Sequence, residues 1–266
     1  MRTPLKLMTF NISEGGGNEA RFARILDLLR RTTPDILILQ ECEGWEDSKR
    51  LAQVSEALGL AFCMSHSRLG EARPRGSGQR HNVAAFSRLP FKRFETHNNP
   101  AFLGHCLVEF EVDWDGTPLT VFGTQFDAKN ENLRFVEARY LRSLLDPAKF
   151  RSGLYALAGD LNSLSFNDPY PVDLEAMLRE SRTTKYHLPP RYEVLNELAD
   201  FGWVDGLYLK TPARWVTAPR SSGGVSIDFR TDYLMFSPTL ANHVGQTEVV
   251  SINDESDHFP VMSLLI

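Results

Sequence analysis

Hydrophobic residues along this chain gather in short apolar runs separated by polar segments, a pattern typical of buried strands. We predict strands over residues 5–12, 35–40, 83–86, 106–112, 119–124, 154–158, 232–236 and 261–266. Between residues 112 and 117 the chain passes through Asp115-Gly116, a dipeptide favoured in tight hairpin turns. The strands on either side of this dipeptide are therefore predicted to pair.

Helical spacing of apolar residues occurs between several of these runs. Residues 18–31 carry apolar side chains on one face, with Asn18 suited to cap the helix and arginines at the end where the dipole favours cations. Three further segments show the same helical spacing of apolar residues. The first is Leu51, Val54 and Leu58, ending at Gly59, and the second is Val136, Tyr140, Leu141 and Leu144. The third covers residues 192–201 and ends at Gly202. This mixed order favours a layered α/β fold. Because no repeat or linker interrupts it, we predict one domain over residues 1–266.

The run 154–162 is the most informative stretch, because an apolar strand ends abruptly on Gly159-Asp160-Leu161-Asn162. In an extended segment, Asp160 and Asn162 point to the same side and can converge on a metal ion, a phosphate or a water. The same four residues are also good turn formers, since Asp and Asn side chains bond their own backbone. From these residues alone, both interpretations stand.

Polar residues also stand at the ends of other predicted strands. Asn11 and Glu41 each follow an apolar run, and so does Gln125. Asp232 begins a strand, while Asp257-His258 lies just before the last one. A lone acid at a strand end is usually a cap, and an ion pair with Arg230 is the simplest alternative for Asp232. Several such sites together favour a functional site, because catalytic groups gather in strand-end loops.

Five segments, taken in order, resemble the endonuclease/exonuclease/phosphatase superfamily, which includes the DNase I-like nucleases. They are Met8-Thr9-Phe10-Asn11, Leu39-Gln40-Glu41, Gly159-Asp160-Leu161-Asn162, Arg230-Thr231-Asp232-Tyr233 and Ser256-Asp257-His258. Ser87-Arg88-Leu89-Pro90 is similar to a further strand end of that family. The resemblance spans about residues 5 to 266. It implies a four-layer α/β sandwich, in which two packed mixed β-sheets are flanked by helices and the site lies at one edge.

The resemblance also implies a role for each strand-end residue. Glu41 is the expected ligand of Mg²⁺, with Mn²⁺ as an alternative, because a hard carboxylate suits either ion. Asp257 belongs to the metal shell or its surroundings, and Asn11 assists Glu41 or binds the phosphate. Asp160 is expected to orient or deprotonate the attacking water.

Three further residues complete the implied site. Asn162 holds a phosphoryl oxygen, and His258 donates to one while Asp232 keeps its imidazole cationic. Gln125 departs from the family, because many members carry histidine there. An amide donates a hydrogen bond to substrate but transfers no proton.

Composition and charge limit which binding partners and which cellular location are expected. The chain holds 42% hydrophobic residues and no apolar run of the roughly 18 residues that a membrane span needs, so we expect a cytoplasmic protein without stable membrane insertion. Its three cysteines lack the spacing of a zinc site and are expected to be buried. The net charge of −5 disfavours nucleic acid, yet segments 65–81 and 181–191 are basic and could rim the cleft. Trp45 and Trp215 either stack bases or pack in the core.

These features together predict a divalent-metal-dependent phosphoester hydrolase, a phosphodiesterase or nuclease that uses a metal-assisted activated water. The expected substrate is a nucleotide or a nucleic-acid end, with inositol phosphates and lipid headgroups as alternatives, and a monomer is expected. The choice between diester and monoester stays open. The alternative function is a phosphate-binding or scaffolding protein that retains the fold with weak or no turnover. A serine hydrolase using Ser163 or Ser256 is disfavoured, since the chain lacks a nucleophile elbow.

Overall fold

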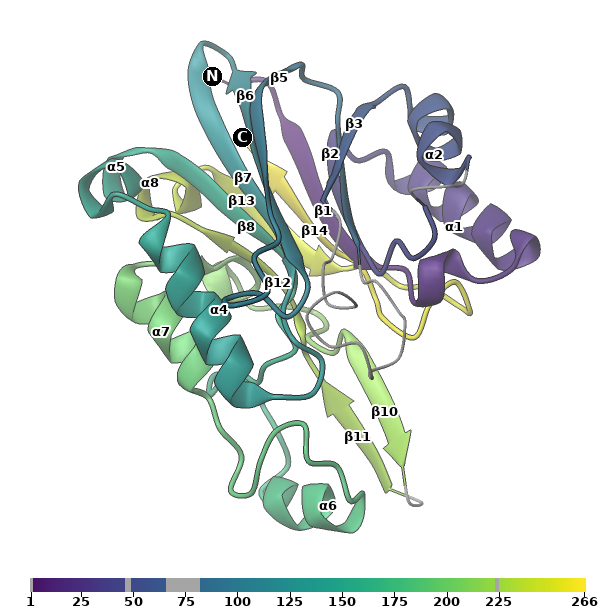
Figure 1. Cartoon of the computed structure of the whole chain (residues 1–266), viewed down its shortest axis with the longest axis vertical. Helices are drawn as coiled ribbons and strands as arrows, with labels where there is room; N and C mark the ends of the chain where they lie inside the picture. Colours follow the sequence, from purple (N-terminus) through teal and green to yellow (C-terminus); the bar gives the residue numbers. More distant parts are fainter. Residues whose placement is uncertain (1, 46–48, 66–81, 223–224) are drawn as a thin grey trace.

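Two six-stranded mixed sheets pack face to face and carry helices on their outer faces (Figure 1). The computed structural model describes residues 2–45, 49–65, 82–222 and 225–266. The first sheet has the order β13 (Val244–Val249), β14 (Val261–Leu265), β1 (Leu5–Asn11), β2 (Ile36–Gln40), β4 (Val83–Ser87) and β3 (Ala61–Ser65). The second has the order β5 (Phe91–His97), β6 (Cys106–Trp114), β7 (Thr117–Gln125), β8 (Leu154–Asp160), β12 (Asp232–Phe236) and β9 (Val204–Asp205). The predicted four-layer sandwich is confirmed.

The main hydrophobic core lies between the two sheets. Ile38 of the first sheet and Val108 of the second are fully buried in it. The sheets approach so closely at Gly123 that a Cβ there would lie 2.7 Å from the Ile38 side chain. Gly159 has a similar constraint within its own sheet, because a Cβ would meet the carbonyl oxygen of Thr124 at 2.0 Å. Glycine at both positions lets the strands that carry the polar ends pack without a gap.

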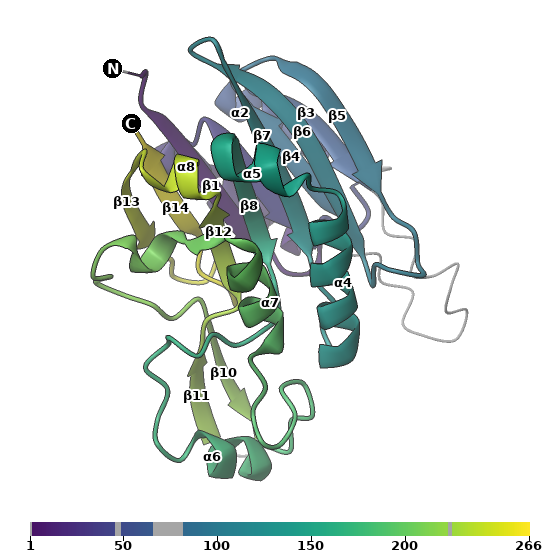
Figure 2. The same cartoon turned by 90° about the vertical axis from the view of Figure 1, so that its left-hand side faces the viewer.

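Helices cover the outer face of each sheet. On one side α1 (Glu19–Thr32) and α2 (Arg50–Leu58) pack on the first sheet, and on the other side α4 (Glu131–Ser143) and α7 (Glu193–Phe201) pack on the second (Figure 1). Shorter elements complete the fold: η1 (Glu14–Gly16), α5 (Pro147–Ser152), η2 (Gly206–Leu209) and α8 (Pro238–Ala241). A separate unit of α6 (Leu174–Glu180) and the hairpin of β10 (Ala218–Ser222) and β11 (Val225–Phe229) extends from one end of the sandwich (Figure 2).

Most predicted elements are confirmed with small changes in their bounds. Asn18 caps α1 by accepting a hydrogen bond from the Arg21 backbone, and α2 ends at Gly59 in the left-handed conformation. The β6–β7 hairpin turns at Asp115-Gly116, where both residues have positive φ. The three cysteines are buried and unpaired by disulfides. No helix among the described residues has the length and apolar character needed to cross a bilayer.

The apolar stripe predicted for α4 is wrong only at its first position, since Leu141 is buried and Tyr140 and Leu144 pack against the core. Val136 is 39% exposed, whereas Glu131, Arg134 and Glu137 are buried together with Leu141. Charged residues take the inward face because Arg134 pairs with Glu131, and because two backbone N–H groups donate to the Glu137 carboxyl. The pattern of apolar runs also failed to predict several strands. One of them is the edge strand β5, whose residues are largely exposed and do not form an apolar run.

Candidate active site

The polar strand ends converge at one end of the two sheets. Strands β1 and β2 run parallel, so Asn11 ends beside Gln40 and Glu41 follows immediately. Strands β7 and β8 also run parallel, which places Gln125 opposite Asp160. Strand β12 runs antiparallel to β8 with Asp232 opposite Asp160. The topology therefore brings together side chains that lie far apart in the sequence.

Glu41 connects the two sheets through hydrogen bonds. Its Oε1 accepts from the side-chain amides of Asn11 at 3.1 Å and Gln125 at 3.0 Å, and its Oε2 accepts from the Glu14 backbone N–H at 3.0 Å. The residue itself has a φ of 57°, a conformation that is uncommon outside glycine. Three donors on one carboxylate fix its position. Gln125, predicted to bind substrate, here orients Glu41.

Asp160 lies buried beside Asn11. Its Oδ2 accepts from the Asn11 side chain at 3.1 Å, and its Oδ1 accepts from the Asn162 backbone N–H at 2.9 Å. Burial, and then the nearby charge of Asp232, raises the pKa of Asp160 above the ordinary aspartate value. A carboxylate with a raised pKa is a stronger base than a surface aspartate, which suits an interaction with water.

The expectation that Asp160 and Asn162 share one extended segment is wrong. Strand β8 ends at Asp160, and Asn162 has a φ of 52°, in the left-handed region. The turn interpretation is confirmed, because the Asn162 backbone N–H donates to Asp160 Oδ1, and both side chains are buried. The Asn162 side-chain amide donates to the Phe126 carbonyl at 2.9 Å, and its Oδ1 accepts from the Lys185 ammonium.

His258 and Asp232 form a buried pair. His258 Nδ1 lies 2.8 Å from Asp232 Oδ2, which also accepts from the Thr231 hydroxyl at 3.1 Å. Burial alone lowers the pKa of His258, but the charge and hydrogen bond of Asp232 outweigh it and raise the pKa to about 9. The simpler alternative of a pair between Asp232 and Arg230 is wrong, because Arg230 instead binds Asp168 and Asp205.

We expect the His258 imidazole to stay protonated across neutral pH in metal-free protein and to titrate near pH 9. Asp232→Asn removes the compensating charge and should lower this pKa by about two pH units. Proton NMR titration of the histidine signals in the presence of a chelator measures the value. Asp254→Asn, which removes an exposed carboxylate paired with Arg24, is the matched control and should leave it unchanged. A wild-type His258 that titrates near 6.5 would contradict the pairing.

The site also contains oxygen atoms suited to a hard cation. One ligand atom each from Asp160, Asp232 and His258 lies within 4.8 Å of the others. Among the described residues, Asp232 Oδ1 and Gln125 Oε1 are buried without a hydrogen-bond partner. Carboxylate and amide oxygens are preferred ligands of Mg²⁺. The Glu41 carboxylate adds oxygen atoms of the same hard type, so these oxygens suit a divalent ion, whereas the protonated His258 does not ligate one.

The segment before β14 is tied to β1. The Ser256 hydroxyl donates to the Asn11 carbonyl at 2.7 Å and accepts from the His258 backbone N–H at 3.2 Å. Asp257, predicted to serve the metal, is exposed between these two residues, and its charge contributes to the raised pKa of His258. The arrangement keeps His258 facing inward while Asp257 faces solvent.

The outlying sequence predictions have mixed outcomes. Trp45 is a core residue whose indole N–H donates to the Gly15 carbonyl at 2.9 Å. Trp215 is half-buried, with its ring packed edge-on against Tyr170. The basic segment 65–81 lies outside the described residues except for Ser65. In segment 181–191, Lys185 reaches the site, which sequence reasoning found only as part of a cationic stretch.

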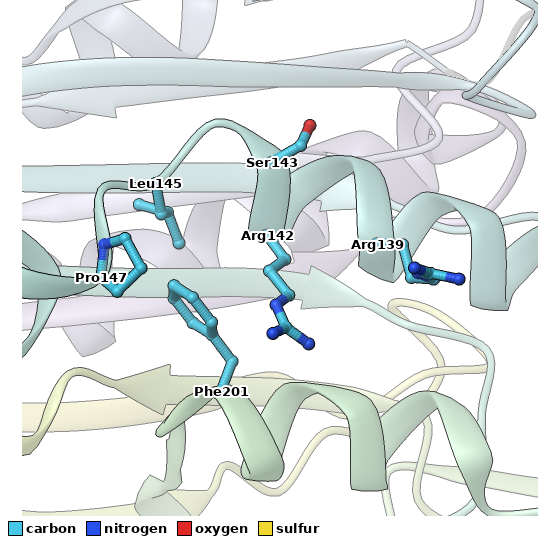
Figure 3. Close-up of a pocket in the computed structure, with 6 residues that line it drawn as sticks. All are labelled: Arg139, Arg142, Ser143, Leu145, Pro147 and Phe201. Carbon is cyan, nitrogen blue, oxygen red and sulfur yellow. The ribbon is translucent and has the colours of Figure 1, made fainter.

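A pocket between α4 and α7 is separate from this site (Figure 3). Arg142 and Phe201 line it, and Arg142 pairs with Glu197 at 2.9 Å. It lies at the C-terminal end of α4, toward the start of β8, whereas the polar residues gather where β7 and β8 end. This pocket therefore does not contribute to the group of polar strand ends.

Comparisons with known proteins agree with this fold and its arrangement. The sequence profile of the Endonuclease/Exonuclease/phosphatase family matches residues 8–258. Similar solved structures include an endonuclease/exonuclease/phosphatase family protein from Leptotrichia buccalis, with 14% identity, a TM-score of 0.71, and coverage of 98% of this chain and 99% of that one. An AP endonuclease from Archaeoglobus fulgidus has 16% identity and a TM-score of 0.71, with 98% and 99% covered.

A further similar structure is a 3′-5′ exonuclease from Neisseria meningitidis, with 19% identity, a TM-score of 0.69, and 98% and 99% covered. No curated protein sequence matches the chain significantly. At these identities the structural likeness establishes the fold, and the profile match over residues 8–258 establishes the relationship in sequence.

Proposed function

The chain belongs to the endonuclease/exonuclease/phosphatase family, and on that premise we propose that it is a divalent-metal-dependent phosphoester hydrolase, a phosphodiesterase or nuclease. The observation that carries the proposal is the junction of the two sheets. Glu41 is held there by three donors beside the buried group of Asp160, Asp232 and His258. Hydrolysis of a phosphoester needs a stabilised negative charge and an activated water, and these residues can supply both.

Metal binding is assigned to Glu41, and the role of a further metal ligand is proposed for the exposed Asp257. A bound Mg²⁺ or Mn²⁺ would supply Lewis-acid stabilisation of the phosphoryl oxygens. Asn11 and Gln125 keep the Glu41 carboxylate in one orientation, because each donates to its Oε1. Neither amide transfers a proton, so Gln125 does not protonate a leaving group.

Water activation is assigned to Asp160. Its two oxygens are oriented by Asn11 and by the Asn162 backbone, and burial strengthens it as a base. His258, cationic through its bond to Asp232, donates from Nε2 to a phosphoryl oxygen as negative charge develops there. Asn162, predicted to hold a phosphoryl oxygen, donates its side-chain amide to the Phe126 carbonyl and accepts from Lys185, so its proposed effect on the phosphoryl group is through Lys185.

A nucleic-acid end or nucleotide is the proposed substrate class. Similar structures bear the names AP endonuclease and 3′-5′ exonuclease, and Lys185 brings a cation from segment 181–191 to the site despite the net charge of −5. The competing function is phosphate binding without turnover. A panel of single-stranded DNA, abasic duplex DNA and chromogenic mono- and diesters, assayed with Mg²⁺ and with Mn²⁺, separates the two. Phosphate binding with no hydrolysis of any member would favour the competitor.

We expect Glu41→Gln to raise the Mg²⁺ concentration needed for half-maximal activity at least about tenfold. Glutamine lacks the charge, and its NH₂ group would face one of the N–H donors that now bind the carboxylate. Mg²⁺ titration of the hydrolysis rate and calorimetric Mg²⁺ binding both measure the change. Glu248→Gln, on the exposed strand β13, is the control for loss of one carboxylate. Equal metal dependence in wild type and Glu41→Gln would remove Glu41 from the metal site.

A further inference from the structure

We propose that Lys185 is a catalytic residue whose ammonium group contacts a phosphoryl oxygen of the substrate beside Asn162. The inference rests on the proposed function and adds a residue to it. Lys185 belongs to the segment between α6 and α7, which lies beyond the ends of the sheets (Figure 1). Its Nζ donates to Asn162 Oδ1, so the cation sits directly next to the turn that follows β8.

Lys185 is held in place from the protein interior. The fully buried guanidinium of Arg134 donates to the Lys185 carbonyl and also to the Asp127 carbonyl, the latter at 2.9 Å. Arg134 is itself neutralised by Glu131, which is also buried. A buried ion pair of this kind adds little net stability but fixes geometry. The segment is therefore anchored, unlike a solvated basic loop.

The next residue provides a second anchor. Tyr186 is buried, its ring packs on Phe229 of β11 at 4.7 Å between centroids, and the Lys185 ammonium lies 5.3 Å from the same ring. With its main chain fixed on both sides, Lys185 loses less side-chain freedom when it meets substrate. Preorganised donors of this type are the most effective in stabilising charge in a transition state.

The charges around Lys185 favour an anionic ligand. Its positive charge partly offsets the rise that burial and Asp232 cause in the pKa of Asp160. The Asn162 amide is already committed to the Phe126 carbonyl, so its oxygen, rather than its NH₂ group, faces Lys185. The lysine is then the group on this side that can offer N–H donors and full charge to a phosphoryl oxygen, opposite the cationic His258.

The test combines removal and restoration of the ammonium group. Lys185→Met should lower kcat/KM about 100-fold or more, the usual cost of losing one donor to a developing oxyanion. It should also weaken binding of inorganic phosphate at least about tenfold, measured by phosphorus NMR.

Lys185→Cys treated with 2-bromoethylamine restores an ammonium at nearly the original position. The native Cys42, Cys63 and Cys106 are buried, which favours selective reaction at residue 185. Lys149→Met, at an exposed position of α5, controls for the change in net charge.

Recovery of activity and phosphate affinity after alkylation, with Lys149→Met unchanged, would support the proposal. It would be overturned if Lys185→Met stayed within about threefold of wild type in both measurements, or if alkylation restored neither. If wild-type protein hydrolyses no phosphoester, the proposed function fails, while the phosphate affinities of wild type and Lys185→Met still decide whether Lys185 binds phosphate.

Discussion

Asp160→Asn should lower kcat/KM about 1,000-fold while leaving the fold intact. Asparagine keeps the shape of the side chain and its ability to accept one hydrogen bond, but it cannot take a proton from water. Because burial raises the pKa of Asp160, the wild-type charge is costly to hold in the interior. Removing this charge saves the cost of burying it, and that gain offsets the loss of one hydrogen-bond acceptor. We therefore expect the free energy of unfolding to change by less than about 1 kcal/mol. Steady-state hydrolysis and urea unfolding measure the two effects.

Asp200→Asn is the matched control for this substitution. Asp200 is exposed on α7, and its replacement should alter neither rate nor stability. An Asp160→Asn enzyme that retained more than about a tenth of wild-type activity would remove Asp160 from the role of base.

Arg230→Met should cost about 3–5 kcal/mol in the free energy of unfolding, the largest stability effect we expect. The guanidinium is fully buried, donates to Asp168 at 2.9 Å and forms a double hydrogen bond with Asp205 at 3.0 and 2.6 Å. Methionine would leave two carboxylates close together without their cation. Urea unfolding at neutral pH measures the loss.

Arg142→Met provides the comparison for an exposed ion pair. Arg142, drawn in Figure 3, is half-exposed. The loss of its ion pair with Glu197 should therefore cost less than about 1 kcal/mol. If Arg230→Met were equally mild, the pairing of Arg230 with Asp168 and Asp205 would not hold the end of β12 in place. Asp232 lies only two residues after Arg230, so a large loss of stability in Arg230→Met should also lower the hydrolytic activity.

Much of the site could be predicted because strand ends are local features. Short apolar runs predicted the strands. Asn11 and Asp160 are the last residues of β1 and β8, and Glu41 directly follows β2. The pairing of His258 with Asp232 came from resemblance to a family. Local sequence patterns do not indicate this pairing, because the contact joins Asp232, at the start of β12, to His258, in the segment before β14 of the other sheet.

What could not be predicted depends on long-range or unusual local geometry. The left-handed conformation of Asn162 breaks the alternation that an extended strand would have. The charged residues of α4 predict an exposed helix face from the sequence, but Arg134 and Glu131 are buried and neutralise each other. The position of Lys185 depends on this buried pair, because Arg134 donates to the Lys185 carbonyl. Local composition therefore indicated only a basic segment.

The most direct measurement is the rate at which purified protein hydrolyses a chromogenic phosphodiester with Mg²⁺, after chelation by EDTA, and after Mg²⁺ or Mn²⁺ is restored. The account predicts that chelation abolishes hydrolysis and that either metal recovers it in wild type, with Asp160→Asn inactive throughout. Hydrolysis that persists unchanged in EDTA, or that is equal in wild type and Asp160→Asn, would contradict a metal-dependent phosphoester hydrolase at the ends of these strands.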